Sequence, residues 1–238
     1  MKQFVYAIII YSLISAGAIA QNYDKGYDAA KIGDYETALK EWRPLVEKGN
    51  ALAQYQIGLL YQHGKGVSKN LVKATTWYRL AAEQNLALAQ SNLGNLYLSG
   101  RGVKRDFKKA LYWSKRAAFQ GEVTAQTRLA FILRYGKGTK RNVPESLIWY
   151  TKAAEQGYAP AQNALATIYA NGKIVRRSYL LALKWLKISS FFGSKKGPGY
   201  RHWVSKKLTT REKKEANQLV HKWIVAYKNK KQRGNSSK

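Results

Sequence analysis

A period of 36 residues runs through most of this chain. One step of this length returns the same residue type at Ala53, Ala89, Ala125 and Ala161; at Gln54, Gln90, Gln126 and Gln162; at Gly64, Gly100, Gly136 and Gly172; and at Trp77, Trp113, Trp149 and Trp185. A fixed period of about 20–50 residues is typical of stacked supersecondary units, each of which buries its apolar face only against its neighbours. The repeat therefore predicts a solenoid, whose function lies on a surface and not in a catalytic cleft.

Each repeat is predicted to contain two helices joined by a glycine loop. Ala53, Ile57 and Leu60 are spaced as one apolar helix face, and a second such face follows the loop that begins at Gly64. Glycine can adopt a positive φ without steric cost, so glycine or asparagine is expected at the ends of the second helices, at Asn85, Gly121, Gly157 and Gly193. The residues before the second helices are preferred N-caps: Asp34, Asn70, Asp106, Asn142 and Ser178.

The repeats and their flanks divide the chain into segments. We expect a signal peptide over 1–20, a truncated first unit over 21–49, four repeats over 50–193 (50–85, 86–121, 122–157 and 158–193), a basic linker over 194–207, a capping helix over 208–227 and a basic disordered tail over 228–238. Pro44 is expected to kink the second helix of the first unit or to end it early. Thr209 and Glu212 match a capping box at the start of the last helix.

The N-terminus has the pattern of a secretory signal peptide. Lys2 precedes an apolar run over Val5–Ile14, and Ala18-Ile19-Ala20 offers small residues for cleavage after Ala20. The alternative is an anchor that stays attached, for which the apolar span is at the lower limit of length. We expect an exported protein, either periplasmic or secreted. The chain has no cysteine, so disulfides and thiolate sites are excluded.

Positive charge is concentrated towards the C-terminus. The chain has 42 Lys and Arg against 13 acids, a net charge of +29, and from Lys173 onward there are 19 basic residues and 2 acidic ones. In an exported protein this excess suggests an anionic envelope polymer or lipid headgroups as partners. The alternative is that the charge serves solubility alone, because net charge bears on association without naming a ligand.

The repeated residues resemble a known family. The positions that carry the resemblance are Ala53-Gln54, Leu59–Tyr61, Gly64-Lys65-Gly66-Val67, Asn70, Ala74, Trp77 and Ala81-Ala82. They are similar to the Sel1-like repeat, a relative of the tetratricopeptide repeat, and four copies in succession make the signal specific. The resemblance implies an all-α fold, a right-handed α/α superhelix with a C-terminal capping helix, and an adaptor or scaffold role without a catalytic residue set.

No constellation of catalytic or metal-binding residues is found. The histidines are His63, His202 and His221, and none of them has the spacing of a metal site. We therefore expect no enzymatic activity, no cofactor, no metal and no small-molecule substrate. Periodic tryptophans are expected in the core. Trp203 lies outside the 36-residue period and has basic neighbours in the sequence. An aromatic residue among cations suits a membrane interface or an anionic polymer.

Two modes of binding remain open. In the first, a protein or peptide lies in the concave face, against first-helix residues that vary between repeats: Tyr55, Leu59, Gln62, Asn92, Asn95, Arg128, Phe131, Arg134 and Asn163. One hypothesis is that Arg128 and Arg134 flank Phe131 on one broad face and anchor a carboxylate; the alternative is that both arginines point to solvent. In the second, an anionic surface binds the C-terminal region: Lys195, Lys196, Arg201, Trp203, Lys206, Lys207, Arg211, Lys213 and Lys214. We expect a monomer, and nucleic acid is not expected as a partner.

Overall fold

The computed structural model describes residues 21–194 and 198–236. The predicted signal peptide over 1–20 and the side chains of Lys195 and Lys196 lie outside the described residues. The chain divides into two compact units, one ending at Trp113 and the other beginning at Ser114. Each unit is described below by itself.

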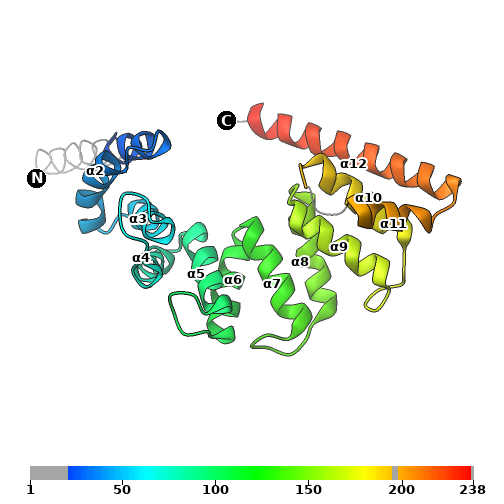
Figure 1. The fold of residues 1–238 in the computed structure, drawn as a ribbon, viewed down its shortest axis with the longest axis horizontal. Coiled ribbons are helices and arrows are strands. Elements are labelled where there is room, and N and C mark those ends of the chain that lie inside the picture. Colours follow the sequence, from blue (N-terminus) through cyan, green and yellow to red (C-terminus); the bar gives the residue numbers. More distant parts are fainter. Residues whose placement is uncertain (1–20, 195–197, 237–238) are drawn as a thin grey trace, which may run out of the picture. The chain divides into compact units, whose positions relative to one another are not determined.

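The described residues fold into α-helices only (Figure 1). A helix over residues 21–31 precedes nine helices of 13 residues each. These are α2 (Tyr35–Glu47), α3 (Ala51–His63), α4 (Leu71–Glu83), α5 (Ala87–Ser99), α6 (Phe107–Phe119), α7 (Val123–Tyr135), α8 (Val143–Glu155), α9 (Ala159–Asn171) and α10 (Tyr179–Phe191). Two further helices follow, α11 (Pro198–Lys206) and α12 (Thr210–Ser236).

Within each unit, consecutive helices of the repeats pack against each other. The first unit has the neighbours α2 and α3, α3 and α4, and α4 and α5. The second has α7 and α8, α8 and α9, and α9 and α10, and α10 also contacts α11 and α12. The predicted all-α solenoid of stacked helix pairs is confirmed. Below, α3, α5, α7 and α9 are called the first helices of their repeats, and α4, α6, α8 and α10 the second helices.

The helix boundaries follow the local signals in the sequence. All five predicted N-caps accept a hydrogen bond from the backbone N–H three residues on, with distances of 2.9–3.2 Å for Asp34, Asn70, Asp106, Asn142 and Ser178. The predicted terminators Asn85, Gly121, Gly157 and Gly193 all have a positive φ. Thr209 and Glu212 form the predicted capping box: the Glu212 N–H donates to Thr209 Oγ1, and the Thr209 N–H donates to Glu212 Oε2.

The second loop glycine is required by close packing as well as by its φ. Gly102 has a φ of +71°, and a Cβ there would lie 2.3 Å from the carbonyl oxygen of Leu71, at the start of α4. Gly66 approaches Tyr35 at the start of α2 in the same way. In the fourth repeat the equivalent residue is Ile174, which does not have a positive φ. This loop therefore has a backbone conformation of its own.

The core is built from small residues and a repeated glutamine. Ala53, Ala89, Ala125 and Ala161 are fully buried, as the period predicts.

The periodic tryptophans differ in burial. Trp149 and Trp185 are buried, at 5% and 6% exposure, but Trp77 and Trp113 are only partly buried. Trp77 packs against the buried core of the first unit without being enclosed by it, so the expected core packing is confirmed in full only for Trp149 and Trp185. Trp77 lines an open hollow of about 220 Å³ together with Leu39 and Val46, because α2 does not cover it completely.

Pro44 does not end α2 early. The helix continues for three residues beyond it, to Glu47, and has the same length as α3 to α10. Pro44 is exposed, and its missing N–H therefore removes a hydrogen bond on the exposed side of the helix. The opposite side of α2 buries Ala38, Trp42 and Leu45. This apolar packing holds the last turn in place.

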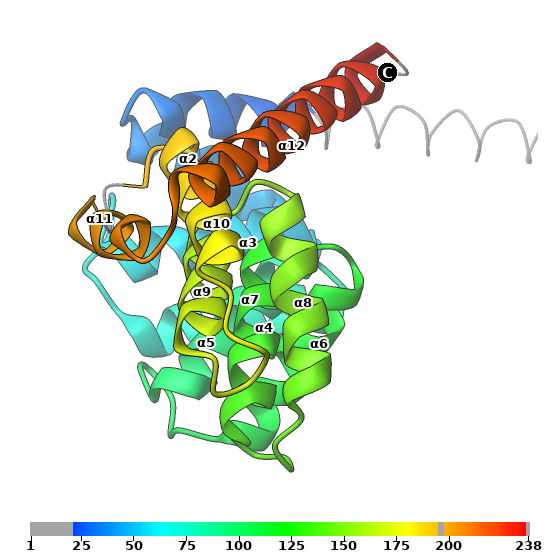
Figure 2. The same cartoon turned by 90° about the vertical axis from the view of Figure 1, so that its right-hand side faces the viewer.

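The C-terminal region differs from the expected linker, helix and tail. The segment expected to be a linker contains α11, and α12 continues to Ser236, where a disordered tail is expected from the sequence. Lysine, glutamine and arginine are good helix formers, so the helix continues once packing has fixed its first half. Figure 2 shows α12 lying across α10. Its ring contacts are those of Trp223 with Trp185 and Phe192, and of Tyr227 with Phe192.

Candidate functional site

In the first unit, three of the predicted binding residues surround one buried hydroxyl group. Tyr78 of α4 is fully buried, and burial raises its pKa well above the usual range of tyrosine. Its hydroxyl donates to Gln62 Oε1 across 3.1 Å and is also hydrogen-bonded to the Asn92 side chain. The Tyr55 ring packs on the Tyr78 ring at 5.7 Å. Tyr55, Gln62 and Asn92 therefore join α3, α4 and α5, and their variation between repeats reflects internal packing.

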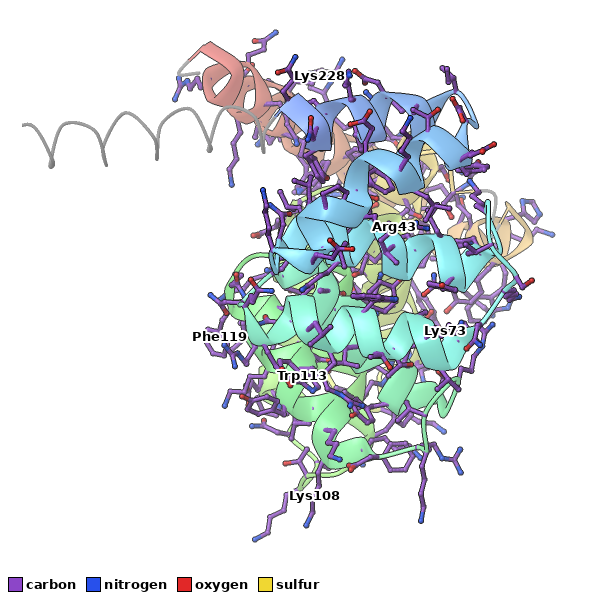
Figure 3. All side chains as sticks on the ribbon, turned by 90° about the vertical axis from the view of Figure 1, so that its left-hand side faces the viewer. Arg43, Lys73, Lys108, Trp113, Phe119 and Lys228 are labelled. Atoms are coloured by element: carbon purple, nitrogen blue, oxygen red, sulfur yellow. The ribbon has the colours of Figure 1, made fainter. Side chains whose placement is uncertain are left out.

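Two other predicted residues of this unit are more accessible. Leu59 is partly buried and Asn95 is exposed. The open hollow beside Trp77 also contains Arg43, which is labelled in Figure 3, and Glu47. Cation and carboxylate are mixed there, so the hollow has no marked preference for one sign of charge.

In the second unit, the structure separates the two predicted arginines. Arg128 lies beside Tyr158 and Glu122, and burial lowers its pKa to about 10, so the guanidinium is charged at neutral pH. Arg134 lies six residues further on, about 9 Å along α7 and about 120° around it. The two guanidinium groups have different neighbours, and one anchor made of both stays a prediction. Asn163 of α9 donates from its Nδ2 to Ser194 Oγ at 3.0 Å.

Arg134 instead belongs to an aromatic cluster at the end of α7. Its guanidinium lies 5.2 Å from the centre of the Tyr135 ring, which packs on Phe131 at 4.7 Å. It also donates a hydrogen bond to the hydroxyl of Tyr150, whose pKa burial raises to about 12. Phe131 and Tyr135 are 38% and 53% exposed. Aromatic and cationic side chains are thus both presented on this part of α7.

A pocket of about 280 Å³ opens beside this cluster. Its lining comes from the ends of α7 and α9 and from the loops that follow them: Arg134, Tyr135, Arg141, Ile168, Asn171, Lys173 and Ile174. Three of these seven residues are cations and none is acidic. Only Arg134 of this lining was predicted from the sequence as a site residue. A signal was present for Ile174, which replaces a repeated glycine, and for Tyr135, whose position varies between the repeats.

The basic C-terminal surface is formed by α11 and the start of α12. Trp203 is 45% exposed, its ring stacks on Tyr200 at 5.6 Å, and the Lys207 ammonium lies 5.7 Å from its centre. Lys206, Lys207, Arg211 and Lys214 are exposed, and Lys213 is partly buried. The Arg201 guanidinium donates to Ser190 Oγ of α10.

The described residues contain no cluster of three His, Cys, Asp or Glu side chains arranged to hold a metal ion. In the same part of the chain, no helix combines the length and the apolar character that crossing a membrane requires. Lysine side chains project from the surface of the first unit, as Lys108 does in Figure 3. Phe119 of the second unit is an exposed apolar side chain, with 67% of its surface accessible.

The Sel1 repeat matches residues 51–86, 87–122, 123–158 and 159–190, which together make up more than half of the chain. The chain belongs to the Sel1 repeat family. Sel1 repeats are typically non-catalytic scaffolds, and the solenoid commonly serves protein–protein interaction. The matched repeats begin one residue later than the sequence analysis places them.

Solved structures of Sel1 repeat proteins are similar to this chain. A protective antigen present in uropathogenic Escherichia coli strains is 34% identical, with a TM-score of 0.80, and the match covers 92% of this chain and 48% of the antigen. A Sel1 repeat protein from Oxalobacter formigenes is 29% identical, with a TM-score of 0.68 and coverage of 89% and 87%. This Sel1 repeat chain thus spans about half the length of the first of these proteins.

A curated relative is similar to a shorter stretch of this Sel1 repeat chain. The DAP3-binding cell death enhancer 1 of Rattus norvegicus is 39% identical over 57 residues, which are 24% of this chain and 11% of the rat protein. This similarity has the length of one to two repeats and therefore supports the repeat fold alone.

Proposed function

We propose that this chain is a non-enzymatic scaffold that binds a protein or peptide partner on the first helices of its repeats. The observation that carries the proposal is the cluster of Phe131, Arg134 and Tyr135 at the exposed side of α7. Aromatic residues and arginine are enriched at binding hot spots, because they combine a large contact area with directional hydrogen bonding. The family supports the same role, since Sel1 solenoids are commonly interaction scaffolds.

The fold dictates none of the side chains in this cluster. Phe131 corresponds to Leu59, Asn95 and Thr167 in the other repeats, and Tyr135 corresponds to His63, Ser99 and Asn171. The repeat therefore folds with small or polar residues at both positions. Two exposed aromatic rings in these places are best explained by a partner that contacts them.

The experiment is affinity capture from an envelope extract, followed by mass spectrometry and by titration calorimetry with the captured protein. Phe131→Thr copies the fourth repeat and should weaken binding at least tenfold, about 1.4 kcal/mol. The control Ile148→Ala removes an exposed apolar side chain from α8 of the same unit and should leave the affinity unchanged. Equal affinities for the wild-type protein and both variants would exclude this face of α7 as the binding site.

We further propose that the protein is exported and that residues 1–20 are its signal peptide. The support is the sequence pattern of a basic residue, an apolar run and a small-residue site. The mass of the intact protein purified from the envelope fraction tests this proposal. The mass of a chain starting at Gln21 is expected, and a mass that includes residues 1–20 would contradict it.

A second candidate function is direct binding of an anionic envelope polymer or of lipid headgroups through α11 and α12. The exposed Trp203 between Tyr200 and Lys207 favours it, because an amphipathic ring beside a cation suits an anionic interface. Co-sedimentation with vesicles that contain anionic lipid should fall for Trp203→Ala combined with Lys207→Ala. Sedimentation that does not change with salt concentration or with these substitutions would exclude the idea.

A further inference from the structure

Two positions of α7 that vary between the repeats and one loop position that has lost its glycine meet at one pocket. Arg134 stands where the other repeats have Gln62, Leu98 and Ala170, Tyr135 replaces His63, Ser99 and Asn171, and Ile174 replaces Gly66, Gly102 and Gly138. All three side chains line the pocket of about 280 Å³ at the ends of α7 and α9. The repeat pattern prescribes none of these three residues, so their meeting at one pocket indicates a function of that pocket.

Arg134 adds charge at a position where each of the other repeats has a neutral side chain. Its equivalent Gln62 accepts the hydroxyl proton of Tyr78, and Tyr78 corresponds to Tyr150 in the period. A neutral glutamine thus completes the same helix contact in the first unit. In the second unit the bond to Tyr150 and the contact with Tyr135 orient a guanidinium group at the pocket. A side chain held on two sides loses little conformational freedom when a ligand binds.

The charge of the pocket favours an anion. Arg134, Arg141 and Lys173 contribute three positive charges, and neither Arg141 nor Lys173 has a carboxylate partner among the described residues. The C-terminal ends of α7 and α9 oppose this, each with roughly half a negative charge. Three cations against about one opposing charge leave the pocket clearly positive.

The remaining lining favours an apolar group attached to that anion. Ile168, Ile174 and the Tyr135 ring form apolar walls between the cations. In the first two repeats the second loop glycine, Gly66 or Gly102, packs closely against the start of α2 or α4. Ile174 has a different backbone conformation and adds a side chain to the pocket wall. At about 280 Å³, the pocket is just below the usual range of small-molecule sites, about 300–1,000 Å³. One amino-acid residue fits this size better than a polymer segment does.

We propose that this pocket binds the C-terminal carboxylate of a peptide whose last residue is apolar. The guanidinium forks of Arg134 and Arg141 match the planar carboxylate, which accepts two parallel hydrogen bonds. Ile168 and Ile174 contact the last side chain. This proposal rests on the proposed function, since it specifies that the protein partner ends in an apolar residue with a free C-terminal carboxylate.

The probes are hexapeptides of alternating glycine and serine that end in leucine, isoleucine, valine or phenylalanine. Each is prepared with a free C-terminal carboxylate and with an amidated one, and is titrated into isotope-labelled full-length protein up to about 10 mM while amide resonances are recorded. The free acids should shift the resonances of Arg141, Lys173 and Ile174. The amides should bind at least about tenfold more weakly. No shift with any free acid, or equal shifts with the amides, would overturn the proposal.

Two substitutions copy other repeats and therefore preserve the fold. Arg134→Gln retains a side chain that can hydrogen-bond Tyr150 but removes the charge, and Ile174→Gly restores the common loop residue. Each should weaken binding of the free acids. Arg141→Ala should do the same, whereas its control Arg105→Ala, at the equivalent position in the first unit, should not. Equal loss in Arg105→Ala would overturn the assignment.

Two more results separate the alternatives. Inorganic phosphate that shifts the same resonances at lower concentration than the peptides would assign the pocket to phosphate and overturn the proposal. In captures from envelope extract, a partner lost with Phe131→Thr but retained with Arg134→Gln and Arg141→Ala would leave the proposed function standing and refute the carboxylate pocket. A partner unaffected by all three would refute both.

Discussion

Gln156 Nε2 donates a hydrogen bond to Gln126 Oε1 across 2.7 Å, and Gln84 makes the same bond to Gln54 across 2.8 Å two repeats earlier. The buried Gln126 in turn donates to the carbonyl oxygen of Ala118 at the end of α6. One glutamine thus connects the first helix of its repeat with two second helices. Gln162 donates to Ala154 in the same way, but its Oε1 has no partner because Phe192 replaces the glutamine that would donate to it.

We predict that Gln126→Met destabilises the protein more than Gln162→Met. The first substitution removes two hydrogen bonds, while the second removes one bond and also an unpaired buried oxygen. The difference in the free energy of unfolding should be about 1 kcal/mol or more. Urea denaturation of both variants measures it. Equal losses would show that the bond from Gln156 contributes nothing.

We predict that Trp149→Ala lowers the free energy of unfolding by about 3–5 kcal/mol, the usual cost of removing a large buried aromatic side chain. Trp149 is 5% exposed, and its ring packs edge-on against Phe119 at 5.1 Å. The matched variant Trp77→Ala should cost clearly less, because Trp77 is partly exposed at the hollow beside α2. Urea melts of the two variants test the order, and a larger loss for Trp77→Ala would contradict it.

We predict that Gly102→Ala is more destabilising than Gly121→Ala. Both glycines have a positive φ, +71° and +91°, so both substitutions introduce backbone strain of about 1–2 kcal/mol. Only at Gly102 would the added Cβ meet backbone, the Leu71 carbonyl at 2.3 Å. Thermal melts should therefore show a visibly lower midpoint for Gly102→Ala. Matching midpoints would mean that the loop moves away from α4 without cost.

We predict that the start of α12 loosens in acid. The backbone and side-chain hydrogen bonds of Thr209 hold the pKa of Glu212 below its ordinary value of 4.5. A depressed carboxyl pKa stabilises the folded state above the unfolded pKa, and this stabilisation is lost as pH falls through the folded pKa. Amide exchange in the first turn of α12 should therefore accelerate, relative to α10, when pH falls from neutral to below 4.5. Glu212→Gln should show a weaker pH dependence, and an equal one would refute the capping role.

The order and ends of the helices could be predicted from the sequence because their causes are local. Asn70 caps α4 through its own side chain, and Gly121 ends α6 through its own φ. Repetition of the same signals every 36 residues made stacked helix pairs the only consistent interpretation. Pro44 shows the limit of a local rule, since the buried side of α2 keeps the helix intact beyond it.

The candidate site was predicted only in part, and only the tertiary structure completed it. The helical period fixes the angle of each side chain on its own helix, and this was enough to select Phe131 and Arg134. Whether the side chain then faces a neighbouring helix, a pocket or solvent depends on the helices packed around it. In the structure, Tyr55 and Gln62 contact the buried Tyr78 of the neighbouring helix. Arg134 and Ile174 line the same pocket although they are forty residues apart, and no local sequence pattern indicates that these two residues lie together.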